Sequence, residues 1–70
     1  MTTSTQYRVV AWTAKGKQYA EIRGRKDDGR ALFIWVRSHG TMTKLDAKDA
    51  NEICDLARAC GTRAQLETVH

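Results

Sequence analysis

The segment ALFIWVR, residues 31–37, constrains the fold of this 70-residue chain more than any other feature. Its β-branched and aromatic residues are typical of a strand, in which successive side chains point to opposite faces. Apolar side chains then occupy both faces: Leu32, Ile34 and Val36 point to one, and Phe33 and Trp35 point to the other together with Arg37. One helix in a chain this short covers only one face of a sheet. The second face must therefore meet solvent, a ligand or another protein surface.

Two longer strands are predicted before this segment, and a short one after it. Residues 7–14 (YRVVAWTA) are rich in β-branched and aromatic side chains. Residues 18–25 (QYAEIRGR) alternate, with Ala20 and Ile22 on one side. Residues 41–45 (TMTKL) form a short fourth strand in this interpretation.

Turn residues separate these strands. Gly16 predicts a first turn, and Asp28-Gly29 predicts a hairpin because both residue types tolerate the positive φ of tight turns. A further turn is expected at residues 38–40. Gly24, inside the second strand, predicts a β-bulge or a close backbone approach.

A single helix is predicted to follow. Asp46 is a suitable N-cap residue, and Asp49 lies three positions later, as in a capping box. Gly61 is expected to end the helix. The apolar stripe at helical spacing comprises Ala50, Ile53, Cys54, Leu56, Ala57 and Cys60. The outer face is expected to carry Lys48, Asp49, Glu52, Asp55 and Arg58.

These elements predict an α+β domain, an antiparallel meander sheet of three or four strands packed on one C-terminal helix. The domain spans residues 7–61, after a disordered N-terminus at residues 1–6. Residues 62–70 are either a tail or an edge strand. The side chains expected to face the helix are Ile22, Leu32, Ile34 and Val36, with either Val9 and Ala11 or Val10 and Trp12.

Composition favours a soluble cytoplasmic protein. A hydrophobic fraction of 41% with 29% charged residues is typical of a globular domain. No apolar run approaches the roughly 20 residues of a membrane span, and the start MTTSTQ is unlike a signal peptide. Cys54 and Cys60 are separated by a rise of ~9 Å along one helix, which predicts reduced thiols rather than a disulfide.

Charge is distributed unevenly along the chain, whose net charge is +4. Residues 1–45 hold nine basic and three acidic side chains, a net charge of +6. Residues 46–70 hold three basic and five acidic side chains, a net charge of −2. A basic sheet region of this kind indicates a polyanionic partner such as a nucleic acid.

The sheet face away from the helix is the candidate binding surface. Aromatic rings that stack on bases contribute about 1–3 kcal/mol per base, and arginine holds phosphate through two hydrogen bonds. The interpretation assigns to this face Tyr19, Arg23, Arg25, Phe33, Trp35 and Arg37. The flanking cations expected to hold phosphates are Lys15, Lys17, Lys26 and Arg30.

Other occupants of this face are open alternatives. Exposed aromatic patches also mark protein interfaces, which favours a homodimer, and the C-terminal segment can fold back over the rings. Small basic chains are typical of phages and mobile elements. The alternative function is therefore an inhibitor that binds and blocks a host protein through Tyr19, Phe33 and Trp35.

Enzymatic, metal and cofactor chemistry has no support in the sequence, so we expect a non-enzyme without cofactors. Ser38 and His39 are neighbours in a turn rather than a nucleophile and its base. Asp27 and Asp28 are too few carboxylates for a calcium or magnesium site. The cysteines and histidines lack the paired spacing of zinc ligands.

Two families resemble parts of the chain. Several strands followed by TMTKLDAKDANEICDLARA (residues 41–59) resemble the single-stranded-DNA-binding domain of the positive cofactor four coactivators. There a short last strand ends in a hydrophobic residue and a capped helix follows, a pattern matched by Leu45, Asp46, Ile53 and Leu56. This resemblance implies a curved basic sheet that holds single strands and a helix-mediated dimer.

The second resemblance is to the arm-type DNA-binding domains of phage tyrosine integrases. It rests on QYAEIRGRKDDGRALFIWV (residues 18–36) and TKLDAKDA (residues 43–50), which carry a D-x-G hairpin and a Lys-acid-Ala helix start. This resemblance implies a three-stranded sheet that enters the major groove of duplex DNA.

Overall fold

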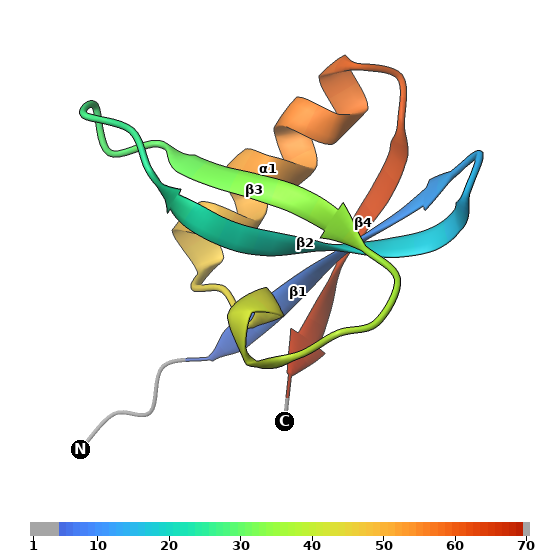
Figure 1. Ribbon diagram of the computed structural model, residues 1–70, viewed down its shortest axis with the longest axis horizontal. Coiled ribbons are helices and arrows are strands. Elements are labelled where there is room, and N and C mark those ends of the chain that lie inside the picture. The colour runs from blue at the N-terminus through green and yellow to red at the C-terminus, as the bar shows by residue number, and fades with distance from the viewer. Residues whose placement is uncertain (1–4, 70) are drawn as a thin grey trace.

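The computed structural model describes residues 5–69 and contains one four-stranded antiparallel sheet and one α-helix (Figure 1). The strands are β1 (Gln6–Thr13), β2 (Gly16–Arg25), β3 (Ala31–Val36) and β4 (Arg63–Val69). The helix α1 spans Ala47–Ala59, and a short 3₁₀ helix, η1, spans Thr41–Thr43. The strand order is β3-β2-β1-β4. The predicted α+β class, a meander sheet packed on one helix, is confirmed.

Strand β4 places the C-terminal segment at an edge of the sheet. It pairs with β1 along its length, from Gln6 opposite Val69 to Trp12 opposite Arg63. The predicted disorder of residues 1–6 concerns mainly residues 1–4, which lie outside the described residues, and Gln6 already belongs to β1.

The predicted strand at residues 41–45 is wrong. Residues 41–43 form η1, and only Leu45 pairs with β1, through two backbone hydrogen bonds with Tyr7 of 2.7 and 2.8 Å. The reason is that β2 pairs with β1 only as far as Val10, which leaves the backbone of Tyr7 available on that side. Leu45 occupies this position and carries its side chain into the core.

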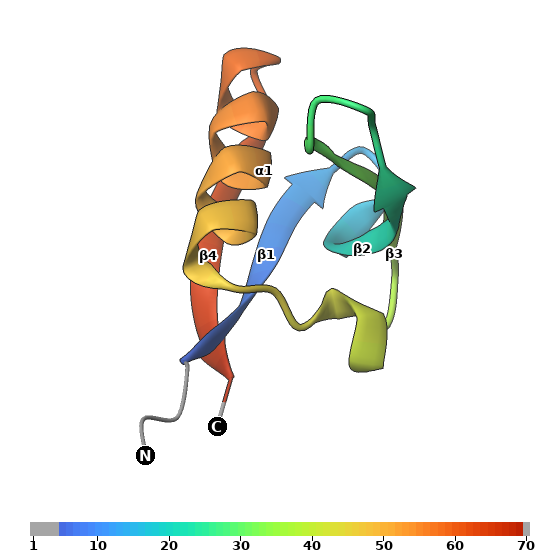
Figure 2. The same cartoon turned by 90° about the vertical axis from the view of Figure 1, so that its left-hand side faces the viewer.

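The hydrophobic core lies between the sheet and α1, on the side we call the helix face. Helix α1 packs against β1 and β4, whereas β2 and β3 extend away from it (Figures 1 and 2). Of the two alternatives for β1, Val9 and Ala11 point into this core. Most of the core side chains are small, and Ile53 is the largest that is fully buried. Small side chains allow the helix backbone to approach the sheet closely.

The two ends of α1 form largely as predicted. The Asp46 side chain accepts a hydrogen bond from the backbone N–H of Asp49 at 2.8 Å, and Gly61 follows the helix with a φ of +82°. The stripe is narrower than expected because Leu56 and Cys60 are exposed. Leu56 lines an open groove between α1 and β3 instead of the core, and Cys60 lies beyond the last helical residue.

The two faces of β3 are the reverse of the prediction, and a β-bulge in β2 is the cause. Ile22 pairs with Phe33 and Gly24 pairs with Leu32, so Arg23 is an extra residue without a partner of its own. The bulge predicted from Gly24 is confirmed. One extra residue reverses the alternation beyond it, so Phe33 and the next ring, Trp35, pack on the core.

The exposed apolar side chains of β3 are consequently Leu32 and Ile34, each 42% exposed. We call the side of the sheet that bears them, away from α1, the open face. Among the described residues, no helix is long and apolar enough to cross a membrane.

Candidate functional site

The open face combines aromatic and charged side chains from β1, β2 and β4 with apolar side chains from β3. Cross-strand partners share a face, so the pairing of Val10 with Tyr19 and Gln65, and of Tyr19 with Val36, places these four residues together. Alternation along each strand gives the remaining members. They are Arg8, Trp12, Lys17, Glu21, Leu32, Ile34, Arg63 and Glu67, with Arg23 at the bulge.

Trp12 and Arg63 form the first feature of this face. They are directly opposite each other on β1 and β4, and the guanidinium carbon of Arg63 lies 4.9 Å from the centroid of the Trp12 ring. This distance is within the range of a cation–π interaction. The contact orients an aromatic ring and an arginine side by side on a surface that α1 does not cover.

Tyr19 is the second aromatic feature. The Nζ of Lys17 lies 5.6 Å from the centroid of its ring. His39, from the loop after β3, also contacts this ring in a T-shaped arrangement, at 5.4 Å between centroids and an interplanar angle of 79°. Tyr19 and Trp12 are diagonal neighbours on adjacent strands, because Trp12 pairs with Lys17. Such neighbours are about 7–8 Å apart.

The open face is basic. Arg8, Lys17, Arg23 and Arg63 outnumber Glu21 and Glu67, four against two, for a net charge of +2. The two acids are accompanied by weak ion pairs, Lys17 to Glu67 at 3.6 Å and Arg23 to Glu21 at 3.4 Å. Exposed pairs of this length contribute ~0–1 kcal/mol, so the cations stay available to an anionic ligand.

The residues predicted from the sequence as one site are distributed over five places. Tyr19, Lys17 and Arg23 lie on the open face, and Lys15 is exposed in the β1–β2 turn beside it. Arg37 is exposed in the loop after β3. The other members lie elsewhere: Phe33, Trp35 and Arg25 on the helix face, and Lys26 and Arg30 in the β2–β3 hairpin.

Arg25 is displaced from the predicted site by the same bulge. It pairs with Ala31 on the helix face, and its guanidinium makes two hydrogen bonds to the carboxylate of Asp49, one of them at 3.1 Å. Asp49 is buried, not on the outer face of the helix as predicted. The hydrogen bonds from Arg25 lower the pKa of Asp49 against the opposing effect of burial, and those to Asp49 raise the pKa of Arg25.

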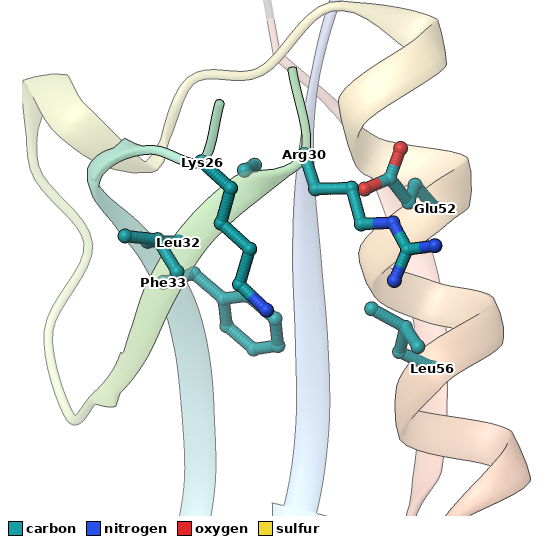
Figure 3. A pocket seen from close by; sticks show the side chains of 7 residues that line it. Lys26, Arg30, Leu32, Phe33, Glu52 and Leu56 are labelled. Carbon is teal, nitrogen blue, oxygen red and sulfur yellow. The ribbon is translucent and has the colours of Figure 1, made fainter. Parts of the chain in front are cut away.

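A groove of about 240 Å³ lies between β3 and α1 (Figure 3). Phe33 points into it from the sheet, and Leu56 lines it from the helix. Lys26 and Arg30 extend over it from the β2–β3 hairpin. Glu52 lies on the helix wall, and its Oε1 is buried without a hydrogen-bond partner among residues 5–69. The groove lies beside β3 because α1 packs mainly on β1 and β4.

Sequence reasoning missed Arg8, Trp12 and Arg63 of the open face, and also His39, which lies against Tyr19 from the loop after β3. Trp12 was one of two alternatives for the helix face, because β1 is apolar on both faces around Val10. Arg63 belongs to the segment for which tail and edge strand were both open. The alternation of RAQLETV, with Ala64 and Leu66 between polar residues, is the signal that identifies the strand and its outward side chains.

Within the part of the chain that the structure describes, no group of three or more His, Cys, Asp or Glu side chains is arranged to hold a metal ion. The two rings with their cations on the open face are the constellation that we consider further. Comparison of the chain with protein-family models, with curated proteins and with solved structures finds no match.

Proposed function

We propose that this protein is a small, non-enzymatic nucleic-acid-binding protein that uses the open face of its sheet. One observation carries the proposal: two aromatic rings, each accompanied by a cation, lie diagonally adjacent on a basic surface that α1 does not cover. Rings that stack on bases, set among cations that hold the backbone, are the common design of single-strand-binding surfaces.

The proposed roles follow from position. Trp12 and Tyr19 stack on successive bases of one strand, since the two rings are diagonal neighbours. Arg63 and Lys17, already beside the rings, hold the phosphates next to those bases. Arg23 extends the cationic track toward the β2–β3 hairpin. Single-stranded nucleic acid is favoured over a duplex because bases must be unstacked to reach the rings.

A fluorescence titration tests this proposal. The variant Trp35→Phe leaves Trp12 as the only tryptophan, so its emission reports on the open face alone. Titration with a single-stranded oligonucleotide at low salt is expected to quench this emission, and a duplex of the same sequence is expected to bind more weakly. Unchanged emission together with unchanged anisotropy of a labelled single strand contradicts the proposal.

A matched pair of lysines gives the control for charge. Lys17→Gln and Lys48→Gln each remove one positive charge, but Lys17 is on the open face and Lys48 is exposed on α1. For a single strand, removing one phosphate contact reduces the slope of log K against log salt by about 0.7. We expect this reduction for Lys17→Gln and not for Lys48→Gln. Equal slopes for the two variants indicate general charge attraction without a defined site.

The alternative function, inhibition of a host protein through Tyr19, Phe33 and Trp35, stays a prediction. Tyr19 lies on the open face, whereas Phe33 and Trp35 pack on the core on the helix face. One flat partner surface does not reach all three side chains. The open face therefore favours the nucleic-acid proposal over this alternative.

A further inference from the structure

Large exposed apolar side chains concentrate at one edge of the molecule. Residues 5–69 expose four of them. Leu32 and Ile34, each 42% exposed, belong to β3, and Leu56, 47% exposed, lies on α1 and lines the groove beside β3. The fourth, Met42, is in η1. Leu32 and Ile34 are on the open face, whereas Leu56 is across the groove on the helix face. Apolar surface is therefore exposed on both sides of the same strand.

Strand β3 is also the less protected edge of the sheet. It pairs with β2 on one side only, so its outer backbone N–H and C=O groups have no strand partner. Its six residues, ALFIWV, include no charge and no proline. The opposite edge, β4, carries Arg63, Gln65 and Glu67. Charged edge strands resist pairing with other chains, and uncharged ones invite it.

The chemistry of this edge defines the strand that fits it. An added strand would meet Leu32 and Ile34 on the open face, and Phe33 with Leu56 on the helix face. Such a strand must be uncharged and apolar on both faces. Within the described chain, β3 itself has this pattern together with a free edge. We propose that two copies of this chain associate through antiparallel pairing of β3 with β3, which joins their sheets into one of eight strands.

The side chains select the register of this pairing. When the two-fold axis passes through Ile34, Ile34 meets Ile34, Leu32 meets Val36, and on the helix face Phe33 meets Trp35. Residues 32–36 then pair only with one another, all large and apolar, and Ala31 lies opposite Arg37. A register centred on Phe33 would place Arg30 opposite Val36 and the small Ala31 opposite Trp35, so the register centred on Ile34 pairs more of the large apolar side chains with one another.

Charges at the ends of β3 complement this arrangement. Arg37 and Asp27 have no ion-pair partner within residues 5–69 of one chain. In the antiparallel dimer, Arg37 lies opposite Ala31 of the second copy and extends toward its hairpin turn, where Asp27 lies. The same turn carries Lys26 as well as Arg30, which already pairs with Asp28 at 3.2 Å, so Asp27 is the acid of the turn that is left for Arg37.

The dimer would also place both open faces on the same side, because directly opposed residues of antiparallel strands share a face. The inference rests on β3 and its exposed apolar side chains, and does not depend on nucleic acid binding. Its tests are accordingly made without nucleic acid.

Sedimentation equilibrium of the full chain over a range of concentrations measures the association. We expect the wild type to form a dimer, and Ile34→Lys to weaken the association at least about tenfold, since two lysines would face each other across the two-fold axis. Met42→Lys is the matched control, because it adds the same charge at an equally exposed apolar residue away from β3. Circular dichroism checks that both variants are folded.

Cysteine crosslinking tests the register. Directly opposed residues have Cα atoms about 4.5–5.5 Å apart, a separation that a disulfide spans. In a Cys60→Ser background, which removes the exposed thiol, Ile34→Cys is expected to give a covalent dimer under mild oxidation, and Met42→Cys is not. A wild type that stays monomeric at high concentration overturns the inference. A dimer that resists Ile34→Lys, or one that Met42→Lys weakens equally, also overturns it.

Discussion

The two faces of the sheet are built on different principles. The helix face is a close-packed core of small side chains around Ile53, and the buried carboxylate of Asp49 accepts hydrogen bonds from Arg25. The open face has rings and cations at its surface, and its one fully buried side chain is Val10, beneath its larger neighbours. The buried contacts that stabilise the fold lie on the helix face, and the exposed aromatic and charged side chains lie on the open face.

This difference teaches that the two tryptophans have different roles. Trp35 packs against the core and meets Phe33 edge-on at 5.4 Å and 87°. Trp12 is on the opposite side beside Arg63. If the comparison is correct, substitutions on the helix face change the free energy of unfolding, and substitutions on the open face change the affinity for nucleic acid.

The largest expected effect is on the helix face. Ile53→Ala removes the largest fully buried side chain and leaves a cavity, which is expected to lower the free energy of unfolding by about 2–5 kcal/mol. Urea denaturation followed by circular dichroism measures this loss. Affinity for a single strand, measured where the variant is still folded, should not change. A parallel loss of affinity in the folded protein would break the comparison.

The tryptophan pair sharpens the comparison most directly. Trp12→Ala is expected to weaken single-strand binding by about 1–3 kcal/mol, the usual contribution of one stacked base. Trp35→Ala is expected to lower the free energy of unfolding by about 2 kcal/mol, below the ~3–5 of a fully buried aromatic, because Trp35 is only partly buried. Anisotropy and denaturation of both variants decide the matter. If instead Trp35→Ala weakens binding and Trp12→Ala lowers the free energy of unfolding, the site lies on the helix face.

The ion pair on the helix face predicts a dependence on pH. The pKa of Asp49 is lower in the folded chain than the ~3.9 of an unfolded aspartate. Ionised Asp49 therefore stabilises the fold above that value, and this contribution is lost as the pH falls through the lower, folded pKa. We expect Asp49→Asn to be less stable than wild type at pH 7, and the difference to shrink below about pH 4. Denaturation at several pH values measures it, and a difference that grows toward acid contradicts the assignment.

The smallest expected effect concerns Arg63. Arg63→Gln removes the cation beside Trp12, an exposed interaction that contributes about 0.5–1 kcal/mol. We expect slightly weaker single-strand binding and a lower salt dependence, with the free energy of unfolding almost unchanged. Arg58→Gln is an instructive comparison, because Arg58 donates a hydrogen bond to the backbone of Ala64 and should affect stability instead.

The elements with unambiguous local signals could be predicted from the sequence. Asp46 identified the start of the helix, and Asp28-Gly29 identified the β2–β3 hairpin, where Gly29 adopts a φ of +87°. Ala20 and Ile22 were correctly assigned to the helix face because β2 alternates clearly up to that point. In each case one residue type had a strong preference for one conformation or one face.

The candidate site could be predicted only in part, because β3 is apolar on both faces. Nothing in ALFIWV distinguishes Phe33 from Ile34 as the inward residue. Leu32, Ile34 and Val36 were assigned to the helix face without considering how the bulge that Gly24 indicated changes the pairing of β2 with β3. The rings were consequently placed on the wrong face, and Arg25 with them. The predicted type of surface, aromatic and basic, is present on the open face with Trp12 in place of Phe33 and Trp35.

The bulge at Arg23 makes the chain tolerant of a change in length at this point. Arg23 is exposed and has no cross-strand partner of its own. Deleting it would leave every pair of β2 and β3 in place, from Tyr19 opposite Val36 to Arg25 opposite Ala31, because the residues on either side are already paired. The aromatic side chains of β3 would stay on the helix face, and Asp49 would keep Arg25. A library of single deletions should therefore retain this one, whereas deletions within the paired residues of β3 should be depleted because they reverse the faces of the residues that follow.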